Sequence, residues 1–206
     1  MTQATRRAVL AGAGALATSS AVAQSQAPAG APPRVILQTA DGPITIELAA
    51  DKAPGTCANF LRYVDAKRYD GGVFYRALKL SPQPLAGLIQ GGVKNDPAKA
   101  FPPIAHESTK ATGLSHKDGA VSMARYDPGT ATSEFFICIG DVVSLDADPS
   151  QPGDNAGFAV FAHVVDGMDT ARKILADHVS ATTGEGSMKG QMLDPEVAIV
   201  SARRVA

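Results

Sequence analysis

Residues 34–48 contain two runs of alternating side chains separated by a four-residue turn signal. Alternate positions share one face in each run: Val35, Leu37 and Thr39 in the first, and Ile44, Ile46 and Leu48 in the second. The segment Ala40-Asp41-Gly42-Pro43 between them is rich in turn-forming residues. Because successive side chains of a strand point to opposite faces, this period of two predicts a β-hairpin.

The rest of the chain predicts further short strands and two helices. A helix is expected over 54–66, where Cys57, Phe60, Leu61 and Val64 form an apolar stripe, and a second over 168–177. Short strands are predicted at 73–80, 88–90, 119–124, 134–139, 158–164 and 196–204, whereas 81–87 is expected to be a loop because it contains two prolines. This pattern favours a mainly β fold, an antiparallel sheet or barrel with helices at its ends.

Composition limits the function classes that are open to the chain. The 206 residues are 45% hydrophobic and 19% charged, which is typical of one globular domain. The formal net charge of −1 gives no electrostatic reason to expect nucleic acid or an anionic membrane as partner. Two cysteines are too few for a disulfide scaffold.

The first 23 residues are interpreted as an export signal rather than as part of the fold. Arg6 and Arg7 precede an Ala/Gly-rich apolar run, and Ala21-Val22-Ala23 offers a small-x-small cleavage site. The paired arginines resemble a twin-arginine signal, which predicts a periplasmic protein. A frayed terminus or an uncleaved membrane anchor is the alternative. Residues 24–33 are Pro/Ala/Gly-rich and predict a flexible tether, followed by one domain over 34–206.

A search for reactive groups leaves few candidates. The four histidines are dispersed, and the sequence contains neither a Cys-x-x-Cys pair nor a Gly-x-Ser-x-Gly elbow. The remaining unusual residue is Arg76, inside the apolar strand Phe74-Tyr75-Arg76, because an arginine on an apolar strand is costly to bury without partners. An edge arginine that reaches solvent would explain Arg76, and plain core packing would explain Met123 and Phe136.

Eight short segments, taken in order, resemble the cyclophilin family of peptidyl-prolyl cis/trans isomerases. They are GPITIEL from 42, APGT from 53 with Asn59-Phe60, YDG from 69, FYR from 74, IQGG from 89, GAVSMA from 119, SEFFI from 133, and Phe161 with VVDGM from 164. The resemblance implies an eight-stranded antiparallel closed barrel capped by two α-helices.

The resemblance also implies the site. The family's catalytic arginine corresponds to Arg76 and its active-site glutamine to Gln90. The other positions that correspond to substrate-binding residues are Leu88, Ala124, Arg125, Glu134, Phe136, Leu145 and Phe158. It implies a monomer that acts on proline-containing polypeptides and assists the folding of exported proteins, with no metal or cofactor. A proline-recognising binding module with weak catalysis is the alternative, and a small-ligand barrel is a third.

Four departures from the family pattern carry their own expectations. Gly87 stands where a phenylalanine is usual and the adjoining loop is long, so one pocket wall is expected to differ. Arg125 and Glu134 replace Asn and Gln, and their opposite charges predict an ion pair at the groove rim, against two solvated charges as the alternative. Ser144 replaces a tryptophan, which predicts weak binding of the macrocycle cyclosporin.

The two cysteines are a separate matter from these departures. Cys57 and Cys138 are expected to be separate core thiols rather than a disulfide.

Overall fold

The computed structural model describes residues 1, 30–82 and 85–205. Apart from Met1, the predicted export signal over 1–23 lies outside these described residues, as does most of the predicted tether, and both remain predictions. The described elements, in chain order, are β1 Arg34–Thr39, β2 Gly42–Leu48, α1 Pro54–Asp65, β3 Gly72–Pro82, β4 Leu85–Gly92, α2 Thr109–Thr112, β5 Ala120–Met123, β6 Phe135–Ile139, η1 Val143–Leu145, β7 Ala159–Asp166, α3 Met168–Ala176, β8 Val179–Ser180, η2 Gly186–Met188 and β9 Met192–Arg204.

The strands form one closed barrel in which every pair is antiparallel. Their order is β1-β2-β7-β5-β6-β4-β3-β9, and β9 pairs back onto β1 to close the ring. The two-residue strand β8 pairs only with β9 and lies outside the ring. The mainly β, eight-stranded barrel implied by the sequence is therefore confirmed.

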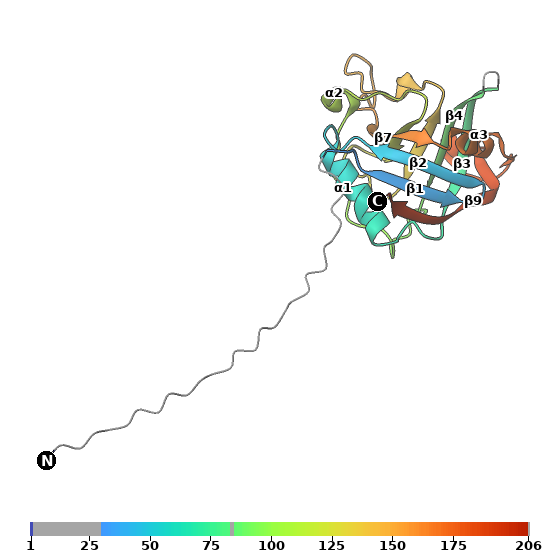
Figure 1. The fold of residues 1–206 in the computed structure, drawn as a ribbon. Coiled ribbons are helices and arrows are strands. Elements are labelled where there is room, and N and C mark those ends of the chain that lie inside the picture. The colour runs from blue at the N-terminus through green and yellow to red at the C-terminus, as the bar shows by residue number, and fades with distance from the viewer. Residues whose placement is uncertain (2–29, 83–84, 206) are drawn as a thin grey trace. The chain divides into compact units, whose positions relative to one another are not determined.

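The two predicted helices lie at opposite ends of the barrel (Figure 1). In α1 the predicted residues Cys57, Phe60 and Val64 are buried, while Leu61 is partly buried against the same core. The N-terminus of α1 receives no side-chain cap from the preceding Ala53. Instead the Glu107 carboxylate accepts hydrogen bonds from two amides of its first turn, where a negative charge is favourable.

Helix α3 buries Ala171, Ile174 and Leu175 against the barrel. The third helix, α2, was not predicted, because its four residues are too few to show a helical period. Its N-terminus is capped by Ser108, whose hydroxyl accepts from the Ala111 amide.

The loop predicted for 81–87 is wrong in most of its extent. Strands β3 and β4 continue as a hairpin, with Ser81 opposite Ala86 and Pro82 opposite Leu85. A proline is tolerated at a strand end where its missing N–H is not needed for the ladder. Gly87 lies within this hairpin at a φ of +156°, and a Cβ there would lie 1.9 Å from the Leu78 carbonyl oxygen. Close approach of the two backbones therefore requires glycine at this position.

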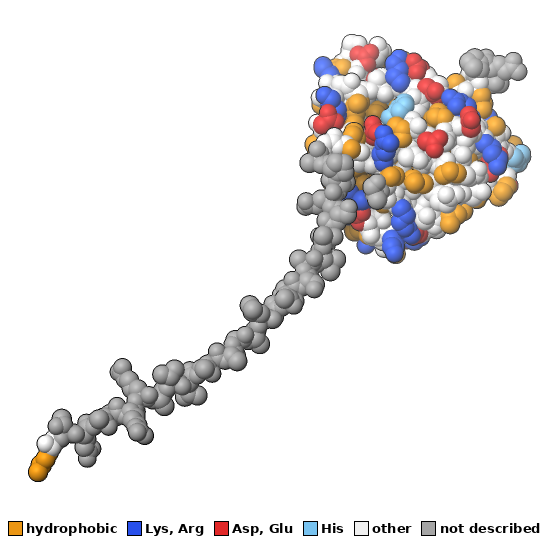
Figure 2. Space-filling model, viewed as in Figure 1, with side chains coloured by type: hydrophobic (Ala, Val, Ile, Leu, Met, Phe, Trp, Pro, Cys, Tyr) orange, Lys and Arg blue, Asp and Glu red, His pale blue; other side chains and the backbone are white. Residues whose placement is uncertain are grey.

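Strand alternation divides the apolar residues between two clusters. Phe135 and Ile137 of β6 point into the barrel core, whereas Phe136 and Cys138 belong to a second cluster with Leu88. This second cluster lies on the outer side of the barrel wall. On the face of the molecule shown in Figure 2, acidic and basic side chains are interspersed.

Candidate active site

A pocket of about 460 Å³ lies on the outer barrel wall, over the second apolar cluster. Residues from both halves of the chain line it, and these include all nine site residues expected from the sequence: Arg76, Leu88, Gln90, Ala124, Arg125, Glu134, Phe136, Leu145 and Phe158. Strands β3, β4 and β6 are neighbours in the barrel, which explains how segments far apart in sequence meet here.

The apolar part of the pocket is built from aromatic and aliphatic side chains. Phe136 and Phe158 meet edge to face, with ring centroids 5.5 Å apart and an interplanar angle of 85°. Leu88 and Leu145 belong to the same cluster. Such a surface suits a compact apolar group such as a pyrrolidine ring. The plain core-packing alternative for Phe136 does not account for its place on the pocket wall.

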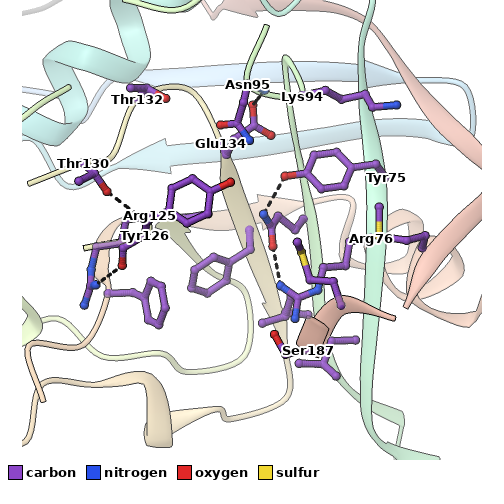
Figure 3. Close-up of a pocket in the computed structure, with 18 of the residues that line it drawn as sticks. Tyr75, Arg76, Lys94, Asn95, Arg125, Tyr126, Thr130, Thr132, Glu134 and Ser187 are labelled. Atoms are coloured by element: carbon purple, nitrogen blue, oxygen red, sulfur yellow. Dashed lines mark hydrogen bonds between the residues drawn. The ribbon is translucent and has the colours of Figure 1, made fainter. Parts of the chain in front are cut away.

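Arg76 lies beside this apolar surface and is held by two amide oxygens. Its Nη1 donates to Gln90 Oε1 at 2.8 Å, and its Nε donates to Gln191 Oε1 at 2.8 Å. Gln90 Nε2 in turn donates to the hydroxyl of Tyr75 at 2.7 Å (Figure 3). An edge arginine that merely reaches solvent would not need these partners, so the structure argues against that alternative.

A β-bulge brings both Tyr75 and Arg76 to the pocket. In the β3–β4 ladder Phe74 pairs with Gly91 and Arg76 with Gln90, so Tyr75 has no partner of its own. The bulge breaks the strict alternation that would otherwise point the two side chains to opposite faces. Sequence reasoning missed Tyr75 because nothing in a single sequence marks a bulge at this position.

The electrostatic setting keeps Arg76 cationic and Tyr75 neutral. Burial lowers the pKa of Arg76, an effect opposed by the adjacent Tyr75, yet a guanidinium stays protonated at neutral pH. Burial, reinforced by the nearby Glu134 carboxylate, raises the pKa of the Tyr75 hydroxyl. Among the described residues no carboxylate forms a salt bridge with Arg76, so its charge is presented to the pocket without neutralisation by a counter-ion.

The predicted ion pair between Arg125 and Glu134 is wrong. The Arg125 side chain, 1% exposed, binds the Asp154 carboxylate through two nitrogens at 2.7 and 3.0 Å. It also donates to the Gly157 and Tyr126 carbonyl oxygens. Its guanidinium carbon lies 4.8 Å from the centroid of the Phe158 ring. Arg125 therefore braces the pocket wall, and the alternative of two solvated rim charges is wrong as well.

Glu134 instead accepts hydrogen bonds from the amides of a backbone turn. Its Oε1 accepts from the amides of Val93 at 2.9 Å and Asn95 at 3.1 Å, and from the Ser133 hydroxyl at 3.0 Å. Lys94 and Asn95 have φ values of 58° and 53°, and successive amides in such a turn converge on an anion. Figure 3 shows Glu134 beside Asn95, on a different part of the wall from Arg125. The local backbone thus offers donors closer than Arg125.

A buried polar group lies behind the pocket and was not expected from the sequence. His116 is fully buried; its Nδ1 lies 2.6 Å from Asp146 Oδ1 and its Nε2 lies 3.0 Å from the Ser122 hydroxyl. Asp146 follows Leu145 directly, so the group is linked to the pocket wall. The sequence alone gives no sign of this group, because Asp146 lies 30 residues from His116 and reaches it only in the folded chain.

The two cysteines are buried and free, as the sequence favoured. Burial raises the pKa of each thiol to about 12, with a smaller contribution from nearby carboxylates. Neither thiol is therefore a thiolate at neutral pH, the form that acts as nucleophile. Among residues 30–82 and 85–205, no group of three or more His, Cys, Asp and Glu side chains could hold a metal ion. No helix of that part of the chain is long and apolar enough to span a bilayer.

The barrel and its outer pocket define a domain with a binding site for a small apolar group next to a cation. Comparison with known proteins gives the family. Residues 34–204 match the model described as "Cyclophilin type peptidyl-prolyl cis-trans isomerase/CLD". The chain belongs to the cyclophilin-type peptidyl-prolyl cis-trans isomerases.

Curated relatives and solved structures agree with this assignment. Peptidyl-prolyl cis-trans isomerase B of Escherichia coli is 33% identical over 81% of this chain and 96% of its own. A peptidyl-prolyl cis-trans isomerase of Acinetobacter baylyi is 38% identical over 68% of this chain and 70% of its own. A cyclophilin-type isomerase of Cryptosporidium parvum, solved in the presence of the dipeptide Ala-Pro, has a TM-score of 0.63 at 21% identity, covering 84% of this chain and 99% of its own.

Proposed function

We propose that this chain accelerates cis/trans rotation about X–Pro bonds, with Arg76 as the residue that lowers the barrier. The uncatalysed barrier is about 18–20 kcal/mol, because amide resonance is lost as the bond twists. Exchange then takes tens to hundreds of seconds, which is slow enough to limit folding. No covalent bond has to break, so the site needs only to favour the twisted state.

The single observation that carries the proposal is the placement of Arg76 beside the apolar pocket. A proline ring held against Phe136 and Leu88 would bring its nitrogen toward the guanidinium. The nitrogen lone pair becomes a good hydrogen-bond acceptor only as resonance is lost. The interaction with Arg76 is therefore stronger in the transition state than in the ground state, which is the condition for catalysis.

Rates measured on an Ala-Pro-containing tetrapeptide test this role. Arg76→Ala is expected to lower kcat/KM at least a hundredfold, because about 2.7 kcal/mol of stabilisation corresponds to that factor. Arg203→Ala, at an exposed position of strand β9, is the matched control and should keep the wild-type rate. Equal rates for wild type and Arg76→Ala would remove Arg76 from the mechanism. Proline-peptide binding without any exchange by the wild type would favour the binding module instead.

The proposed setting is the periplasm, where the isomerase would assist the folding of exported proteins. This part rests on the sequence of residues 1–23, with Arg6-Arg7 ahead of an apolar run and Ala21-Val22-Ala23. Replacing both arginines by lysine should retain the precursor in the cytoplasm if the twin-arginine route is used, whereas a Sec-type signal would tolerate the change. Fractionation followed by mass measurement of the mature N-terminus distinguishes the two routes and locates the cleavage site.

A further inference from the structure

We propose that Gln191 is a positioning residue that holds Arg76 in its working orientation. This inference rests on the proposed role of Arg76 and extends it to a residue outside the pocket. Gln191 is not among the residues that line the pocket, so it would act through Arg76 rather than on a substrate.

The backbone register fixes Gln191 next to Arg76. Arg76 pairs with Met192 in the β3–β9 ladder, and the Gln191 carbonyl accepts from the Ala77 amide at 2.9 Å. The hairpin of β8 and β9 closes the base of the loop that ends at Gln191, with Ser180 opposite Met192. The main chain of Gln191 is thereby anchored to the strand that carries the arginine.

The side chain of Gln191 is held at both of its polar ends. Its Oε1 accepts from Arg76 Nε at 2.8 Å, while its Nε2 donates to the Ser187 carbonyl oxygen at 2.6 Å. The second bond fixes which end of the amide faces the arginine. Gln90 holds Nη1 of the same guanidinium, so two acceptors from two sides define the plane of the group.

The choice of amides as partners has a chemical consequence. A guanidinium carries five N–H groups, and the two glutamines occupy one on Nε and one on Nη1, which leaves the others for a substrate. A neutral amide orients the cation without cancelling its charge. In a half-buried site, a carboxylate in the same place would weaken the field that Arg76 directs at the proline nitrogen.

The substitution Gln191→Met removes the acceptor and keeps the side-chain length. We expect a three- to tenfold fall in kcat with KM changed less than twofold, because a hydrogen bond of this kind corresponds to about that factor in rate. Gln38→Met, at an exposed position on β1, is the matched control and should retain the wild-type kcat and melting midpoint.

A double-mutant cycle with Arg76→Lys separates action through Arg76 from a general effect on the fold. The single ammonium group of lysine cannot donate to Gln90 and Gln191 in the geometry of the guanidinium. Gln191→Met should therefore cause no further loss of kcat in that background. Multiplying effects, or an unchanged kcat in the single variant, would overturn the proposal. If Arg76→Lys itself kept the wild-type rate, orientation of the guanidinium would not matter and the proposal for Gln191 would fail, whereas Arg76→Ala tests the role of Arg76 separately.

The side-chain Nε–H resonance of Arg76 gives a readout that does not depend on activity. In the wild type its exchange with solvent should be slow, in Gln191→Met fast, and in Gln191→Glu slow again, because a glutamate oxygen accepts the same bond. The resonance is assigned by its loss in Arg76→Lys. Equally slow exchange in wild type and Gln191→Met, or fast exchange in Gln191→Glu, would contradict the proposed contact.

Discussion

The imidazole ring of His116 stacks on the phenyl ring of Phe136, with centroids 5.7 Å apart and an interplanar angle of 11°. His116 is in turn held between Asp146 and Ser122. The floor of the apolar pocket thus rests on a buried polar group whose two ends are fixed. Removing the His116 side chain should therefore lower the stability of the fold and disturb the floor of the pocket.

Replacing His116 by alanine should therefore lower the free energy of unfolding by about 3 kcal/mol. The change leaves a cavity beneath Phe136 and deprives Asp146 and Ser122 of a partner, and both effects destabilise. Urea unfolding measures the loss. His163→Ala, at an exposed position, is the control and should cost less than about 0.5 kcal/mol. A similar small cost for His116→Ala would show that the buried group contributes little.

The same histidine predicts how stability depends on pH. Burial lowers the pKa of His116 below its ordinary value of 6.5, although the hydrogen bond and charge of Asp146 oppose that shift. In the unfolded chain the His116 imidazole is protonated near pH 6.5, whereas in the folded chain it is protonated only at a lower pH. Stability therefore falls as the pH drops below 6.5, until the lowered pKa is passed, by at most about 1.4 kcal/mol per pH unit.

Unfolding free energies at about pH 7.5 and about pH 5 measure this effect. In His116→Gln, which cannot titrate, the difference between the two values should be smaller than in the wild type. An unchanged difference would show that His116 is not the group responsible.

At lower pH a separate loss of stability is expected from Asp146. Burial raises the pKa of Asp146, but its hydrogen bonds from Ser115 and His116 outweigh that effect and hold the pKa below 3.8.

Arg125 and Glu134 have separate partners in the structure, so substitutions of the two residues should lower stability independently. Arg125 binds Asp154 and Glu134 binds backbone amides, so the pair shares no contact. The stability losses of Arg125→Asn and Glu134→Gln should add in the double variant to within about 0.5 kcal/mol. A coupling energy of 1 kcal/mol or more would restore the ion pair that the sequence suggested.

The aromatic wall predicts a loss in peptide binding rather than in the twisting step. Phe136→Ala removes a ring that contacts both His116 and Phe158, and the pocket loses its main apolar surface. We expect KM for a proline peptide to rise at least tenfold. Phe101→Ala is the control, because that ring packs on Tyr63 away from the pocket. A KM unchanged by Phe136→Ala would place the proline ring elsewhere.

Much of the fold could be predicted because the barrel strands alternate and the helices show their stripe. The hairpin at β1–β2 and the buried faces of α1 and α3 follow directly from period two and period 3.6. Strand ends were less predictable: the prolines at 82 and 84 suggested a loop where β3 and β4 pair at Pro82 and Leu85. Pairing across strands, which a single sequence does not record, decided that outcome.

The candidate site was predictable only as far as ordered motifs mark it. All nine expected residues surround one pocket, but the sequence did not indicate which groups they form hydrogen bonds and ion pairs with. The sequence could not show that a bulge turns Tyr75 toward Gln90, or that Gln191 arrives beside Arg76 from 115 residues away. Charge alone suggested the wrong partner for Arg125, because nearer groups compete for it once the chain is folded.

The rate of cis/trans exchange on the enzyme itself tests the role of Arg76 without interference from peptide binding. Line-shape or exchange NMR on a proline peptide at saturating wild type and Arg76→Ala separates rotation from binding. We expect an on-enzyme exchange rate at least a hundredfold lower for Arg76→Ala, with peptide affinity changed less than threefold. An unchanged exchange rate, or a fall explained entirely by weaker binding, would contradict the role of Arg76 in stabilising the twisted bond.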